Sequence, residues 1–125
     1  MSSLASAATA AETELRDAVA AAQIGNVGRA RVSARRAVGA FIQAVAGPLE
    51  LDPGTHAMAN LRWVGSNSGL PHEIRAAAAR LLGGPRSIAE GGVVSNDPVL
   101  DAQTVIGYFQ QLAKKLNPAS NKANR

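Results

Sequence analysis

Five stretches of this chain repeat apolar residues at intervals of three and four, and each ends at a glycine, proline or asparagine. That spacing places apolar side chains on one side of an α-helix, and the residues that follow stop the helix. The pattern predicts helices over about 8–24, 27–46, 53–65, 71–82 and 98–116. No segment shows the sustained alternation of polar and apolar residues that marks a half-buried strand. We therefore expect an all-α fold, an antiparallel bundle of about five helices.

Local signals set where these helices begin. Thr9 and Glu12 have the spacing of a capping box, which places the start of the first helix close to residue 8. Asp52 and Asp97 each precede a proline, the order expected of an N-cap followed by the first helical residue. The longest irregular connection is expected at 83–96.

Length and composition indicate one core. A chain of 125 residues is long enough to bury a single core without disulfides or metals, and it has no cysteine. Alanine is the largest single contributor to the 46% hydrophobic share, whereas aromatic residues make up 3%, a balance that favours close helix packing. We predict a single helical domain over 1–117 and a polar, disordered tail over 118–125.

The sequence gives no indication of secretion or of a membrane-spanning helix. The first ten residues lack the basic start and apolar run of a secretory signal, and no run is long enough to cross a bilayer. The cytoplasm is the expected location. A formal net charge of +4 favours acidic partners such as nucleic acid, nucleotide or an acidic protein surface.

Residues 28–37 differ most from the rest of the chain in composition, because they include four arginines, Arg29, Arg31, Arg35 and Arg36. A short connection around residue 26 makes the first two helices an antiparallel hairpin, in which residues equidistant from the turn face each other. By that count Arg35 lies level with an acidic residue, Asp17. Arg29 and Arg31 lie level with uncharged residues of the first helix.

The positions of Arg29 and Arg31 call for an outside counter-charge. Both lie in or beside the first turn of their helix, where a cation costs about 0.3–1 kcal/mol against the helix dipole. The candidates are a carboxylate of the same chain, a carboxylate of a second subunit, or a bound phosphate, which suits a helix N-terminus and guanidinium groups. We identify the four arginines as the candidate surface for an anion or nucleic acid.

A second feature of the same helix concerns assembly. Gly28, Val32 and Gly39 fall opposite its predicted inward side, between arginines. Small residues there allow another helix to approach closely. The second helix is therefore either central in the bundle or part of a dimer contact, and we expect a homodimer.

Catalytic patterns are weak. His56 and His72 each lie near a predicted helix start without a second metal ligand at a suitable spacing, and Glu73 beside His72 is explained as a first-turn residue. Ser33 has no evident base, and Trp63 at helical spacing is expected to pack rather than to stack on a nucleobase. No glycine-rich phosphate loop is present. We predict no catalytic residue, no metal site and no cofactor.

The chain also resembles a known family. The segment GNVGRARVSARRAVG at 25–39, Leu70 with Pro71 at the start of a later helix, and SNDPVLDA at 95–102 are similar to small bacterial proteins of the HEPN type. The likeness extends over about 10–116 and rests on helix order and the arginine-alanine segment. It implies a four-helix core with up to five helices, frequent dimers, and association with nucleotide or RNA.

One departure from that family bears on activity. Its ribonuclease members carry a histidine four to six residues after an arginine, and no arginine of this chain is followed by histidine at that distance. Without this pair the in-line cleavage of RNA lacks its general acid and base. We therefore predict a non-enzymatic HEPN-like domain that binds a nucleotide, RNA or an acidic partner through the arginines. The alternative is a dimeric interaction or scaffold protein without such a ligand, whose arginines are used by internal and intersubunit carboxylates.

Overall fold

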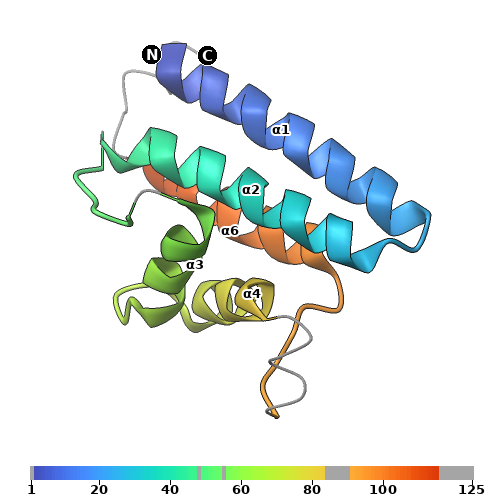
Figure 1. Cartoon of the computed structure of the whole chain (residues 1–125). Helices are drawn as coiled ribbons and strands as arrows, with labels where there is room; N and C mark the ends of the chain where they lie inside the picture. The colour runs from blue at the N-terminus through green and yellow to red at the C-terminus, as the bar shows by residue number, and fades with distance from the viewer. Residues whose placement is uncertain (1, 48, 55, 84–90, 116–125) are drawn as a thin grey trace.

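The computed structural model describes residues 2–47, 49–54, 56–83 and 91–115, with side chains from residue 8 onward. In these residues all regular structure is helical (Figure 1). The helices are α1 (Ser2–Gln23), α2 (Val27–Ala46), α3 (Ala57–Ser66), α4 (His72–Leu82) and α6 (Pro98–Lys115). The all-α prediction is confirmed. The predicted tail at 118–125 and half of the predicted irregular connection, residues 84–90, lie outside the described residues.

Helix α2 is the centre of the arrangement. It packs along α1 in an antiparallel hairpin and also contacts α6, α3 and α4 (Figure 1). On the far side from α1, the short helices α3 and α4 pack against each other, and α4 packs against α6. The glycine-bearing side of α2 was expected either to pack inside the bundle or to form a dimer contact. At Gly39 it packs inside the bundle, because Gly39 is buried against Ala57 of α3.

The sequence of α2 sets its limits and its buried side. The Asn26 side chain accepts a hydrogen bond from the Arg29 backbone N–H at 3.1 Å and so caps the helix. Val27, the first of the apolar residues at three-and-four spacing in α2, is 50% exposed because it opens the helix beside the hairpin turn. The other apolar residues at that spacing are buried, namely Ala30, Ala34, Ala37, Val38, Phe41 and Val45.

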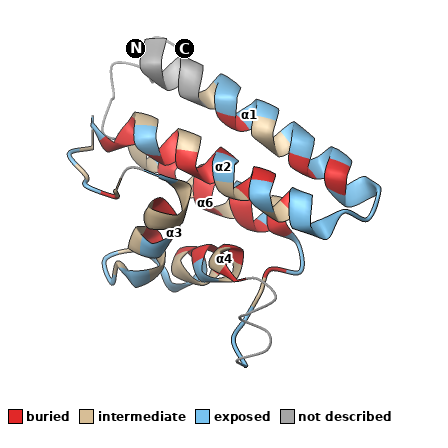
Figure 2. Cartoon of the chain, viewed as in Figure 1, coloured by how far each residue is buried: buried red, intermediate tan, exposed pale blue. Residues whose placement is uncertain are grey.

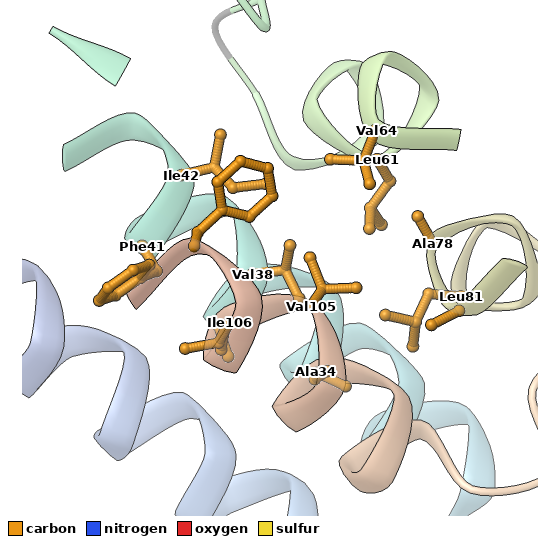
Figure 3. Packing of buried hydrophobic residues seen from close by; sticks show 14 of the residues in the cluster. Ala34, Val38, Phe41, Ile42, Leu61, Val64, Ala78, Leu81, Val105 and Ile106 are labelled. Atoms are coloured by element: carbon orange, nitrogen blue, oxygen red, sulfur yellow. The ribbon is translucent and has the colours of Figure 1, made fainter. Parts of the chain in front are cut away.

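The core lies where α2, α3, α4 and α6 meet (Figure 3). Its largest fully buried side chains include Phe109, Ile42, Leu61 and Leu81. Trp63 is partly buried and its ring centroid lies 6.2 Å from that of Phe109, so it packs as its helical spacing predicted.

Helix α1 packs along α2 mainly through small side chains. Among its residues 8–23, Ala11, Ala18 and Ala21 are buried and Leu15 is partly buried against the core, whereas Val19 is 38% exposed. Each buried methyl contributes about 0.8 kcal/mol, so the three alanines by themselves stabilise the docking of the 22-residue helix modestly. The helix begins at Ser2, so the prediction that Thr9 caps it is wrong, because helix-forming residues continue without a breaker before Thr9.

The start predicted for α3 is also wrong. The helix begins at Ala57, and His56 Nδ1 accepts a hydrogen bond from the Ala59 N–H at 3.3 Å as its cap. Residues 49–54 form a non-helical segment instead, in which Gly54 has a φ of 89°. The Gly54 carbonyl accepts hydrogen bonds from Gln43 Nε2 at 2.6 Å and Asn60 Nδ2 at 3.3 Å. These contacts hold the segment against α2 and α3 and leave Asp52 outside the helix.

Helices α4 and α6 agree with the predicted ranges to within one residue at each end. Asp97 caps α6, because its Oδ1 accepts a hydrogen bond from the Leu100 N–H at 3.1 Å. Lys114 and Lys115 lie in the last turn, where the helix dipole favours cations.

Candidate functional site: the divided arginine block

The four arginines of α2 lie on two different faces of the helix. At 100° per residue, positions 29 and 36 are separated by about 20° and positions 31 and 35 by about 40°, whereas the two pairs point well apart. Burial follows the same division, since Arg29 and Arg36 are exposed while Arg31 and Arg35 are partly buried. The predicted surface of four neighbouring guanidinium groups is therefore two separate pairs.

Arg35 binds the C-terminal end of α4. Its Nε donates to the Leu81 carbonyl at 2.6 Å, and its Nη2 donates to the carbonyls of Leu82 at 3.2 Å and Gly83 at 2.9 Å. The last carbonyls of a helix have no partner within it and carry partial negative charge, so a guanidinium group both satisfies and neutralises them. Asp17, with which Arg35 lies level in the count from the turn, is not its partner, because this side of α2 faces α4 rather than α1. Burial lowers the pKa of Arg35, and the nearby charge of Arg31 lowers it further.

A second set of polar contacts joins the same end of α4 to α6. Arg80 donates to both carboxylate oxygens of Asp101, at 2.8 and 3.1 Å, and the Ser95 hydroxyl donates to Asp101 at 2.6 Å. The Ser95 N–H in turn donates to the Arg80 carbonyl at 3.0 Å. These bonds to Asp101 raise the pKa of Arg80 above its usual value. We refer to Arg35, Arg80, Ser95 and Asp101, with the carbonyls of 80–83, as the α4 clasp.

The α4 clasp was not predicted from the sequence. Asp101 is 6% exposed and Ser95 is 2% exposed, so both belong to the interior. A signal existed at Asp101, which falls on the inward side of α6 beside Ala102 and Val105, where an unpartnered carboxylate is costly. Its partner is 21 residues away in the sequence, and no local pattern identifies it.

Arg29 and Arg36 lie together in a shallow depression between α1 and α2. The depression measures about 280 Å³ and includes Glu14 and Asp17 of α1. Ser33, which is buried, and the exposed residues Gly28 and Val32 complete it. We refer to the surface formed by Glu14, Asp17, Gly28, Arg29, Val32, Ser33 and Arg36 as the hairpin face.

Both signs of charge are present on the hairpin face. The expectation that α1 offers no carboxylate near Arg29 is wrong, because Glu14 and Asp17 line the same depression. Counting residues from the turn compares Cα positions only, whereas an extended arginine side chain reaches beyond the pitch of about 5.4 Å of one helical turn. In the part of the chain that the structure describes, none of these four charged groups forms a salt bridge within the hairpin face. Their hydrogen-bonding groups are therefore open to a partner.

Arg31 has a different environment from the other three arginines. It is partly buried, and its Nε is a buried donor without an acceptor. Its charge acts on Arg35, four residues along the same helix. The structure thus places Arg31 with Arg35 rather than on the hairpin face, and a ligand for it stays a prediction.

The remaining candidates have ordinary structural roles or open surroundings. His56 is the cap of α3, while His72 and Glu73 are exposed at the first turn of α4. In residues 2–47, 49–54, 56–83 and 91–115 there is no group of three or more metal-binding side chains. No helix in those ranges is both long and apolar enough to cross a bilayer. A second hollow of about 300 Å³ lies between α1, α2 and α6, and the buried residues Phe41 and Ile106 line it.

Comparison of the chain with protein-family models, with curated proteins and with solved structures finds no match. The resemblance to HEPN proteins therefore stays a prediction.

Proposed function

We propose that this chain is a non-enzymatic interaction domain that binds another protein surface through the hairpin face. The observation that carries the proposal is the mixed charge of that face, where Arg29 and Arg36 share a depression with Glu14 and Asp17. A protein partner with both acidic and basic side chains matches all four groups. Complementary charges of this kind give an interface its register and its selectivity.

The same layout weakens the case for a polyanion. A nucleic-acid strand that contacts Arg29 and Arg36 also brings its phosphates towards Glu14 and Asp17, and like charges repel. Of the four arginines in the block, Arg35 is already bound to three carbonyls of α4. The number of guanidinium groups available to phosphates on the hairpin face is thus half of what the sequence predicted.

The proposal is non-enzymatic because of what the hairpin face contains. Guanidinium groups and carboxylates open to water recognise charged partners, whereas catalysis needs a nucleophile or acid-base pair in a site that excludes water. Ser33, the one hydroxyl of the hairpin face, is 4% exposed.

A phosphate-bearing ligand, RNA or nucleotide, is the second candidate. It is favoured by Arg29, which is exposed in the first turn of α2, where free backbone N–H groups attract anions. The resemblance to HEPN proteins supports the same ligand class.

A titration of the purified full chain with labelled RNA, DNA and ATP separates the two candidates. It compares wild type with Arg29→Ala/Arg36→Ala, and with Arg62→Ala as a control that removes an exposed arginine of α3. The proposal predicts weak binding that is alike in all three proteins. Binding that falls steeply with salt, and that is lost in the double variant but kept in Arg62→Ala, contradicts the proposal and establishes the phosphate ligand.

A further inference from the structure

We propose that the partner of the hairpin face is a second copy of this chain, which packs hairpin against hairpin about a two-fold axis. This inference rests on the proposed function, because it names the protein that the hairpin face binds. Three observations carry it: the order of the charges, the exposure of α1, and the uncharged strip beside the arginines of the hairpin face.

The charges are sorted by helix. The carboxylates of Glu14 and Asp17 come from α1, and the guanidinium groups of Arg29 and Arg36 come from α2. A two-fold axis parallel to the hairpin, lying in the interface, places α1 of one copy opposite α2 of the other. Each row of carboxylates then faces a row of arginines, twice over by symmetry. A surface with this order is complementary to itself, as a two-fold dimer requires.

Helix α1 has a large free surface for such packing. Its contacts within the chain are mainly with α2 and much less with α6, and its outward side is exposed along the described length (Figure 2). From helix length and diameter, one face of the hairpin measures about 30 Å by about 20 Å. Its area is of the same order as the roughly 800 Å² that each partner buries in a standard interface. Packing two hairpins together makes a four-helix arrangement in which α1 contacts α2 of both copies.

The hairpin face also carries uncharged surface beside its arginines. Val32 is 42% exposed, and a Cβ placed on Gly28 would meet no atom within 4 Å. At 100° per residue, positions 32 and 28 lie about 40° and about 80° from position 36, so they form an uncharged strip that borders the row of arginines. A small residue and an exposed valine at that border let a second copy approach closely.

Sedimentation velocity of the full chain and of two charge-reversed variants tests the dimer. One variant is Arg29→Glu/Arg36→Glu, which makes both rows acidic, and the other is Glu14→Arg/Asp17→Arg, which makes both rows basic. Like charges opposed across an interface cost several kcal/mol, so each variant alone is expected to dissociate with a Kd raised at least about 100-fold. Mixed in equal amounts, the two variants are expected to form a heterodimer, because every opposed row is then of opposite sign.

Circular dichroism of each variant establishes that it is folded, and Arg62→Glu is the matched control that reverses a charge outside the hairpin face. Three results overturn the inference: a monomeric wild type, a dimer unaffected by charge reversal at the hairpin face, or two monomeric variants that fail to combine. If the wild type is monomeric and does not bind RNA, the homodimer is excluded, and the proposed function stands with a different protein as the partner. Binding of RNA through Arg29 and Arg36 removes the proposed function itself.

Discussion

The α4 clasp and the hairpin face hold the same residue types in different surroundings. In the α4 clasp, Arg35, Arg80 and Asp101 are joined to the interior by bonds of 2.6–3.2 Å. On the hairpin face, Arg29 and Arg36 lie beside carboxylates in an open depression. Within the described residues, α2 therefore carries Arg35 bonded to the end of α4 next to Arg36, which forms no salt bridge.

The largest effect is expected in the interior of the α4 clasp. Asp101→Ala removes the acceptor of Arg80 and Ser95, and we expect the free energy of unfolding to fall by about 3 kcal/mol, because bonds to a buried carboxylate are lost together. Urea unfolding measures it. Asp17→Ala, on the hairpin face, is the control and is expected to change stability by less than about 0.5 kcal/mol. Equal losses would remove the distinction between the two regions.

A second effect compares two glycines on one side of α2. A Cβ at Gly39 would lie 3.1 Å from Ala57 of α3, so Gly39→Val is expected to lower stability by about 2 kcal/mol through overpacking. Gly28→Ala meets no neighbour and is expected to raise stability by up to about 0.5 kcal/mol through helix propensity. Thermal unfolding of both variants checks the pair, and a tolerated valine at Gly39 would contradict the close packing of α2 and α3.

A smaller effect concerns the cap of α3. His56→Ala removes the acceptor of the Ala59 N–H and is expected to cost about 1 kcal/mol. His56→Ser supplies another capping oxygen and is expected to recover most of that loss. If alanine and serine prove equally destabilising, His56 acts through something other than the cap.

The smallest effect is expected on the hairpin face. Arg29→Gln removes an exposed cation from the first turn of α2, and stability is expected to change by no more than about 0.5 kcal/mol in either direction. Differential scanning calorimetry at low protein concentration measures it in the single chain. A loss as large as that of Asp101→Ala would show that Arg29 has an internal partner.

Much of the fold could be predicted from local sequence. The limits of α2, α4 and α6 depend on caps and breakers next to the helices, such as Asn26 and Asp97. The start of α3 could not be predicted from local sequence. Asp52 has the residue type of a cap but lies in a segment that is fixed by contacts from Gln43 and Asn60. Those contacts come from other parts of the fold.

The candidate site was predicted in part. The clustering of four arginines on the second helix could be predicted from the sequence. Their separation into two pairs could not, because the partners of Arg35 are carbonyls 46–48 residues away, and every residue has a backbone carbonyl whatever its type. A helical wheel separates positions 29 and 36 from 31 and 35, but only the packing of α4 shows which pair is enclosed.

Urea unfolding of Arg35→Ala and Arg36→Ala, side by side, tests the division of the arginine block most directly. The two residues are adjacent, so helix propensity and net charge change alike. At the lowest workable protein concentration, Arg35→Ala is expected to lose about 2 kcal/mol, because three carbonyls at the end of α4 lose their donor, and Arg36→Ala less than about 0.5 kcal/mol. Equal losses, or a larger loss for Arg36→Ala, would contradict the account.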